Sequence, residues 1–195
     1  MSDSYIFRYI IILVVIVSVL LSGAAMLLKP YQDRNVKNEQ RINILKAAGI
    51  TGVDNKNAEQ LYKQHCTAEL LINEDGEITD NGTLPLYIID NQISVIPMHG
   101  NGLWGPIWGY IGLSEDFSTV VGAVFDHKSE TPGLGAEITT DDFRSQFSGR
   151  KMQHNGDNLS VEVDAIAGAT RTSDGVKNMI KNVLEAYKPY IERHE

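Results

Sequence analysis

The sequence predicts an α+β protein in which one N-terminal transmembrane helix precedes a domain of antiparallel sheet with packed helices. Three observations lead to this prediction. Residues 10–28 form an uncharged apolar run, helical patterns flank a β-rich middle, and short turns rather than helices separate the strand-like segments. Strands joined by short turns pair antiparallel, and amphipathic helices bury their apolar faces on such a sheet.

The apolar run at 10–28 is long enough to cross a membrane. A helix of that length rises roughly 28 Å, close to the thickness of the bilayer's hydrocarbon core. Pro30 is expected to end this helix, which divides the chain into an anchor at 1–30 and a domain at 31–195. A cleaved signal peptide is the alternative, with Arg8 before the run and small residues at 22–24 as its cleavage site. Because the run continues to Leu28, we expect a permanent anchor.

The charges beside the apolar run bear on the orientation of the anchor. Arg8 precedes the run, whereas Lys29, Arg34 and Lys37 follow it. The charge rule alone would keep the C-terminal side in the cytoplasm, but this rule is weak for a long following domain.

Helices are expected at 33–48 and 58–71, with Asn57 as the N-cap of the second. Gly-containing turns follow at 73–76 and 80–82. Cys66 is the single cysteine of the chain, so no internal disulfide or cysteine cluster for iron–sulfur binding is possible. We interpret Cys66 as a packing residue of the second helix.

The strands are predicted from short apolar segments at 84–89, 93–96, 107–113 and 120–126, with 114–118 as a hairpin turn. A short helix is expected at 141–147 and a second hairpin within 151–163, turning at 155–158. An apolar alternation at 159–163 resembles a strand, and the final helix is expected at 173–191.

The charge balance excludes one class of partner. The chain carries 17 basic and 25 acidic residues, a net charge of −8. Without Arg8, Lys29 and Asp3, the domain at 31–195 has a net charge of −9. Nucleic-acid binding needs basic patches that displace counterions, so we expect no nucleic-acid partner.

The sharpest candidate for chemistry is Thr170, which follows Gly168 and Ala169 just before the final helix. Unpaired backbone N–H groups and the helix dipole stabilise a phosphate at a helix N-terminus. A phosphate ester on Thr170 would therefore find a site already built for it. The alternative is a helix-capping threonine, although Thr172 and Ser173 lie nearer the expected helix start and could provide the cap.

Two other segments have features of a binding site. Residues 130–135 (Glu-Thr-Pro-Gly-Leu-Gly) form either a plain Pro-Gly turn or a loop whose glycines let the backbone approach a flat ring, with Leu134 packed on it. Trp104 and Trp108 lie among glycines. We take Trp104 either as a wall of a pocket or as a core aromatic, and Trp108 as a core residue.

These blocks together resemble the FMN-binding domain family. Gly168-Ala169-Thr170-Arg171-Thr172, with Asp164 upstream, is similar to the family's attachment motif. Gly102-Leu103-Trp104, Gly109-Tyr110, the 130–135 loop and the anchor helix occur in the family's order. Within the family the chain resembles the C subunits of sodium-translocating NADH:quinone oxidoreductases. Ala167 departs from the pattern, since the family usually has serine there.

The resemblance implies FMN joined to the Thr170 hydroxyl by a phosphoester bond. It implies a role for Asp164 in recognition by a flavin transferase during maturation, and a flavin pocket built from the loops around Thr170. The residues expected at the cofactor are Leu103, Trp104, Glu130, Thr131, Pro132, Gly133, Leu134, Gly135, Asp164, Gly168, Ala169, Thr170, Arg171, Thr172 and Ser173.

No metal site and no catalytic side chain are expected beside the flavin. The five histidines show no metal-ligand spacing, and His127, near Glu130, is expected to be a solvated loop residue. The sequence has no dinucleotide-binding fingerprint and only one membrane helix. NADH oxidation, ubiquinone reduction and sodium translocation would therefore belong to other subunits of a membrane complex.

The resemblance implies that the domain lies on the periplasmic side of the bacterial inner membrane, whereas the charge rule alone would place it in the cytoplasm. Two alternatives stay open from the sequence. The G subunit of the related Rnf complex uses the same domain, and an exported binding or assembly domain without flavin would fit Ala167.

Overall fold

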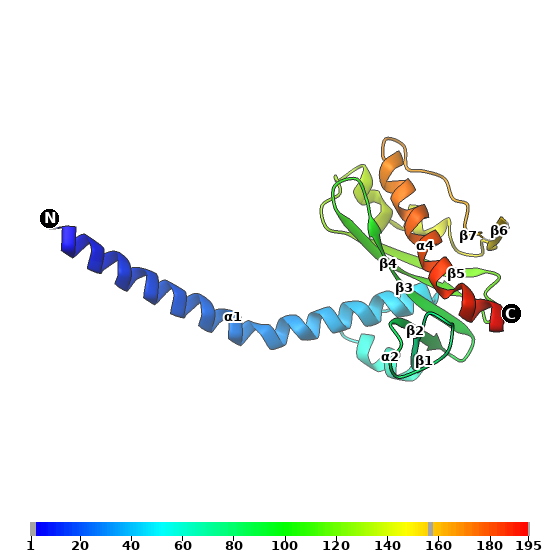
Figure 1. Cartoon of the computed structure of the whole chain (residues 1–195), viewed down its shortest axis with the longest axis horizontal. Coiled ribbons are helices and arrows are strands. Elements are labelled where there is room, and N and C mark those ends of the chain that lie inside the picture. Colours follow the sequence, from blue (N-terminus) through cyan, green and yellow to red (C-terminus); the bar gives the residue numbers. More distant parts are fainter. Residues whose placement is uncertain (1–2, 156–157, 195) are drawn as a thin grey trace. The chain divides into compact units, whose positions relative to one another are not determined.

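The computed structural model describes residues 3–155 and 158–194. The chain divides into two compact units, Met1–Gln40 and Arg41–Glu195 (Figure 1). The first helix, α1 (Asp3–Ala47), begins in the first unit and ends in the second. Each unit is described by itself.

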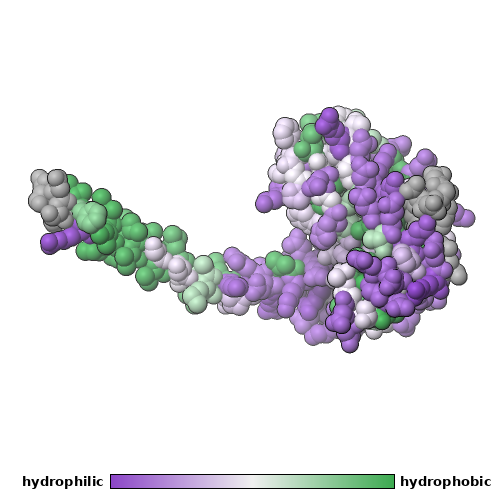
Figure 2. All heavy atoms as spheres, in the orientation of Figure 1, coloured by the Kyte–Doolittle hydropathy of each residue, from purple (hydrophilic) through white to green (hydrophobic). Residues whose placement is uncertain are grey.

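The first unit is a single helical segment. Its described side chains are exposed as far as Lys37, and Figure 2 shows a hydrophobic surface along its apolar run. Within the described residues, α1 is the one helix whose length and composition suit a membrane span. The expected helix end at Pro30 is wrong, because α1 continues through Pro30 to Ala47. An internal proline removes one backbone hydrogen bond, and the long helical runs on both sides retain the others.

The second unit is built on a five-stranded sheet in the order β1-β2-β3-β4-β5, with each neighbouring pair antiparallel as predicted. The strands are β1 (Cys66–Ile72), β2 (Leu84–Ile89), β3 (Ile93–Asn101), β4 (Pro106–Leu113) and β5 (Val120–His127). Strand β3 runs past Pro97, where the sequence suggested an end. Strand β2 pairs with β3 only up to Val95, so Pro97 has no β2 partner. The backbone N–H that proline lacks is therefore not needed for pairing on that side.

The predicted helix at 58–71 is wrong in its second half. The helix α2 (Ala58–His65) stops where β1 begins. Residues 66–72 alternate between half-buried and exposed side chains, the pattern of a strand, and pair with β2. The predicted cap is also wrong: the Asn57 side chain makes no cap bond, and its Oδ1 accepts the Asp54 N–H instead.

Helix α4 (Thr170–His194) covers one face of the sheet (Figure 1). Its buried side chains, such as Met179 and Leu184, join a core cluster with Ile96 of β3. Tyr187 of the same helix donates a hydrogen bond from its hydroxyl to the Pro85 carbonyl oxygen (2.6 Å), and burial raises the pKa of Tyr187.

The end of α1 and helix α2 lie on the opposite face. Val95 belongs to their cluster, whereas its neighbour Ile96 belongs to the α4 cluster, and successive strand residues point to opposite faces. Half-buried Cys66 packs against this second cluster, in agreement with its interpretation as a packing residue.

Two glycines let the end of α1 approach the sheet closely. Gly112 of β4 and Gly122 of β5 are register partners. A Cβ on Gly112 would overlap the Ala47 carbonyl oxygen, and one on Gly122 would lie 2.9 Å from the same atom. The helix end therefore rests directly on the backbone of two neighbouring strands.

The remaining elements are one short helix that was not predicted, η1, and the predicted short helix and second hairpin, in the predicted order. They are η1 (Gly135–Thr139), α3 (Asp141–Ser145), β6 (Gln153–Asn155) and β7 (Asn158–Ser160). Strands β6 and β7 form the expected second hairpin, and residues 156–157 of its turn lie outside the described residues. The strand predicted at 159–163 ends at Ser160, and α4 begins three residues earlier than expected, at Thr170.

Candidate functional site

A tight turn places Thr170 at the first residue of α4. The Ala169 N–H donates to the Ile166 carbonyl oxygen (3.0 Å), and Gly168 has φ +77°, a left-handed conformation that favours glycine. The helix starts at Thr170, and the Thr170 side chain is exposed.

The sequence expectation that Thr172 and Ser173 cap the helix is wrong, because both are buried inside its first turn. Ser173 Oγ donates to the Ala169 carbonyl oxygen (3.1 Å) and accepts the Ile166 N–H (3.0 Å), so it closes the turn. The Thr172 hydroxyl donates to Glu130 Oε2 at 2.6 Å. Of these three hydroxyl-bearing residues, Thr170 is the exposed one.

Glu130 lies at the junction of three segments. Its side chain is 4 % exposed. Oε1 accepts a hydrogen bond from the backbone N–H of Trp104 at 2.8 Å, and Oε2 accepts one from the Thr172 hydroxyl. The Glu130 N–H donates to Nδ1 of His127 (3.2 Å), so His127 is a half-buried acceptor and not the solvated residue that the sequence suggested.

The loop at 131–135 is a compact turn beside Thr170. The Leu134 and Ala136 N–H groups both donate to the Thr131 carbonyl oxygen at 3.1 Å. Gly133 adopts φ +75°, and its N–H donates to Glu137 Oε1 (3.1 Å). A Cβ added to Gly168 would lie 3.1 Å from Leu134 Cδ2, so this loop touches the turn before Thr170.

The loop at 102–105 brings a second apolar wall to the site. Trp104 is 65 % exposed and Leu103 is 44 % exposed, which rules out the interpretation of Trp104 as a core aromatic. Trp108, expected in the core, is half-buried. Gly175 of α4 lets the loop lie against the helix, since a Cβ there would overlap the Asn101 carbonyl oxygen.

A cavity of about 330 Å³ lies between this loop and α4. It is lined by Asn101, Gly102, Leu103, Arg171, Asp174, Gly175 and Asn178. The predicted cofactor residues did not include Asn101, Asp174, Gly175 or Asn178. Positions 174, 175 and 178 lie three, four and seven residues after Arg171, on the same face of the helix, and this spacing could have revealed those three.

Asp164 lies apart from Glu130 and its partners. It is exposed, its N–H donates to Gln146 Oε1 (2.8 Å), and it lines a cavity of about 250 Å³ with Arg150, Glu162, Val163 and Lys177. The structure brings the other predicted site residues together around Thr170 but leaves Asp164 at this separate surface.

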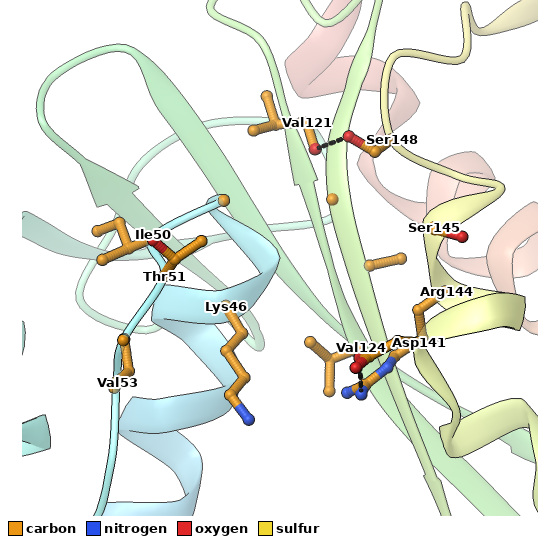
Figure 3. Close-up of a pocket in the computed structure, with 14 residues that line it drawn as sticks. Lys46, Ile50, Thr51, Val53, Val121, Val124, Asp141, Arg144, Ser145 and Ser148 are labelled. Carbon is orange, nitrogen blue, oxygen red and sulfur yellow. Dashed lines mark hydrogen bonds and ion pairs between the residues drawn. The ribbon is translucent and has the colours of Figure 1, made fainter.

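A larger cavity of about 420 Å³ contains none of the predicted site residues (Figure 3). It lies between the end of α1, the 49–53 loop, β5 and α3. Arg144 forms an ion pair with Asp141 there at 2.6 Å. Among the described residues, no group of three or more His, Cys, Asp or Glu side chains is arranged to hold a metal ion.

Comparison with known proteins identifies the family. Residues 102–185 match the FMN-binding domain. The C subunit of the Na(+)-translocating NADH-quinone reductase of Pasteurella multocida is 27 % identical, over 94 % of this chain and 91 % of that protein. The crystal structure of the corresponding C subunit from Parabacteroides distasonis superposes with a TM-score of 0.76 and 32 % identity, covering 84 % of this chain and 96 % of that one.

A further crystal structure, NqrC of Shewanella oneidensis, agrees in fold, with a TM-score of 0.71 and 20 % identity over 84 % of this chain and 98 % of that one. The resemblance predicted from the sequence blocks is confirmed by the match to the FMN-binding domain and by these relatives. The chain therefore belongs to the family of C subunits of the Na(+)-translocating NADH-quinone reductase, an oxidoreductase complex of several subunits.

Proposed function

We propose that this chain carries FMN covalently, through a phosphoester between Thr170 Oγ1 and the FMN phosphate, as an electron-transfer subunit of the complex. One observation carries the proposal. The exposed Thr170 hydroxyl stands at the first residue of α4, with exposed apolar side chains on the loops beside it. This arrangement combines a site for an anion with a surface for a flat ring.

The residues around Thr170 suit a phosphate ester. The first N–H groups of α4 have no acceptor within the helix, and the helix dipole favours negative charge there. Gly168 and Ala169 keep the approach small, and Arg171 is exposed one residue further on. The cavity of about 330 Å³ beside Arg171 leaves room for polar parts of a nucleotide.

The apolar surface beside Thr170 suits the flavin ring. Outside α1, the exposed large hydrophobic side chains of the described residues are Leu71, Ile78, Leu103, Trp104 and Leu134. Three of these five belong to the two loops at this site. Nothing lies within 4 Å of a Cβ built on Gly133, so the backbone at this glycine is open to a ring.

FMN, when bound, supplies the electron-carrying chemistry, while the chain holds and orients it. We assign NADH oxidation, quinone reduction and sodium transport to partner subunits. The named relatives are C subunits, which favours this role over that of the Rnf G subunit.

We further propose that residues 1–30 anchor the FMN-binding domain at 31–195 in the bacterial inner membrane, with that domain on the periplasmic side. The apolar segment of α1 supports the anchor. A flavin transferase would recognise the stretch from Asp164 to Thr170 during maturation, and both of these end residues are exposed.

The test is the mass of the peptide that contains Thr170, after expression of the full chain with a flavin transferase. We expect the mass of FMN less one water on Thr170 and none on Thr170→Val, because valine has no hydroxyl to esterify. Thr170→Ser, which retains a hydroxyl, is the matched control and should be modified at least in part.

An unmodified wild-type peptide would count against covalent attachment and favour an assembly role without flavin. A modified Thr170→Val chain would move the acceptor to another hydroxyl. Because Thr170 is exposed, thermal unfolding of the valine variant should match wild-type apoprotein within about 0.5 kcal/mol.

A further inference from the structure

We propose that Glu130 is a positioning residue. Its buried carboxylate holds the Trp104 loop and the first turn of α4 in one fixed arrangement, and it does not itself bind the flavin. The inference rests on the proposed function, since the arrangement that it fixes is that of the FMN site.

The first argument is burial. Glu130 is the one charged residue among the buried polar side chains of the described residues. A buried carboxylate is costly unless donors satisfy its oxygens. Here both oxygens accept: Oε1 takes the Trp104 N–H at 2.8 Å, and Oε2 takes the Thr172 hydroxyl at 2.6 Å. Two accepting oxygens suit the ionised form, which has no proton to donate.

The second argument is sequence separation. Trp104 precedes Glu130 by 26 residues, and Thr172 follows it by 42. One side chain therefore joins segments from three distant parts of the chain. Thr172 lies two residues after Thr170 in the same helical turn, so the bond to Glu130 also sets where Thr170 stands relative to Trp104.

The third argument is the packing of glycines against the carboxylate. A Cβ on Gly102 would lie 2.6 Å from Oε1, and a Cβ on Gly135 would lie 2.6 Å from the Thr172 hydroxyl oxygen and overlap Oε2. The backbone of both loops therefore walls off the carboxylate. Because it is enclosed, the carboxylate is not accessible to a ring or a phosphate. Glu130 therefore acts on the site through the residues that it holds in place.

The fourth argument is electrostatic. Thr172 lies in the first turn of α4, where the helix dipole stabilises an anion. The two groups that donate hydrogen bonds to Glu130 are neutral, so they fix the orientation of its carboxylate without neutralising the charge. A buried, hydrogen-bonded network of this kind makes a site rigid when every member is satisfied.

The first experiment needs no flavin. The full chain in detergent, with Trp108→Phe so that Trp104 is its single tryptophan, is compared as wild type, Glu130→Ala and Glu130→Gln. In Glu130→Ala we expect hydrogen exchange of the Trp104 backbone amide to become about tenfold faster or more, because the carboxylate that accepts this N–H is gone. We also expect stronger acrylamide quenching of Trp104 fluorescence.

Glutamine retains an oxygen for the Trp104 N–H, so Glu130→Gln should restore most of the slow exchange. Glu137→Gln is the matched control: Glu137 accepts the Gly133 N–H in the neighbouring loop and should leave Trp104 unchanged. Equal Trp104 exchange in wild type and Glu130→Ala would overturn the inference, as would equal acceleration in Glu137→Gln.

The second experiment uses the flavin-loaded chain and Thr172. Thr172→Val removes the hydroxyl bond to Glu130, whereas Thr172→Ser retains it. We expect Thr172→Val to change the circular dichroism of the flavin band and to weaken quenching of Trp104 by flavin, with the serine variant close to wild type. Identical spectra in the valine and wild-type chains would overturn the inference.

The Thr170 peptide mass, recorded on the same samples, separates the two proposals. An unmodified wild-type peptide would refute the covalent function, and the exchange of the Trp104 N–H would still decide the role of Glu130.

Discussion

Two glycines of one loop exclude side chains for different reasons. Gly135 has no unusual φ, but a Cβ there would overlap Glu130 Oε2 and crowd the Thr172 hydroxyl. Gly133 has φ +75° and no atom within 4 Å of its Cβ position. Substitution therefore meets a packed neighbour at Gly135 and backbone strain alone at Gly133.

We predict that Gly135→Ala lowers the free energy of unfolding by about 1–3 kcal/mol, through overpacking, and reduces flavin loading. Gly133→Ala should lower the free energy of unfolding by about 1–2 kcal/mol, as expected for a residue in the left-handed conformation. Gly149→Ala is the matched control outside the site, since Gly149 also has φ +75° and an open Cβ position. Urea unfolding and flavin absorbance measure both effects; equal flavin loading in Gly135→Ala and Gly149→Ala would contradict the packing argument.

At the residue scale, the sequence suggested which residues form the candidate site but not how they contact one another. The Thr170 motif and the 130–135 loop were identified because these short segments resemble those of the FMN-binding domain family. The bond from Thr172 to Glu130 spans 42 residues, and no periodicity or motif encodes such a long-range pair. The sequence offered Thr172 only as a possible helix cap, and its hydroxyl bonds to Glu130 instead.

Helix α4 contains a glycine in its second turn, although alanine is the better helix former. Gly175 is explained by its neighbour, because the Asn101 carbonyl oxygen occupies the space that a Cβ would need. The close approach brings the end of β3 and the 102–105 loop onto the helix. The site thus depends on how two elements pack.

Gly175→Ala should therefore destabilise the protein by about 1–3 kcal/mol, against the gain of about 1 kcal/mol that helix propensity alone would give. Asn182→Ala, an exposed position of the same helix, should instead gain a few tenths of a kcal/mol. Thermal or urea unfolding measures both changes. Stabilisation by Gly175→Ala would show that the loop shifts away without cost.

At the element scale, the antiparallel strands and the final helix could be predicted from their apolar patterns, but several boundaries were misplaced, and two of these errors are the most informative. Residues 66–72 look helical as a continuation of α2, and only pairing with β2 makes them a strand. Pro30 looks like a helix end, yet α1 passes through it. Both errors concern places where contacts or a long helix outweigh local preference.

At the scale of the whole chain, the exposed apolar segment of α1 requires a membrane or must be removed from the mature protein. We predict that it is retained, so the intact mass of protein purified from membranes should include residues 10–28. A mature chain that begins near Ala24 would instead show that the segment is a cleaved signal peptide.

The same prediction can be tested by substitution. Val15→Arg with Val19→Arg should release the protein from the membrane fraction, because each arginine at the centre of a span costs about 2.5–3.5 kcal/mol. Val36→Arg, also exposed on α1 but beyond the apolar run, is the control and should leave the protein in the membrane fraction.

The contact of Ala47 with Gly112 and Gly122 changes what a mutational scan of this chain would mean. A side chain at either glycine would force the end of α1 off the sheet. Strand β4 begins at Pro106, next to the Trp104 loop, and Gly112 lies six residues along it, about 20 Å away. A variant at position 112 or 122 that lost its colour would therefore report a displaced helix end and identify no contact with the chromophore.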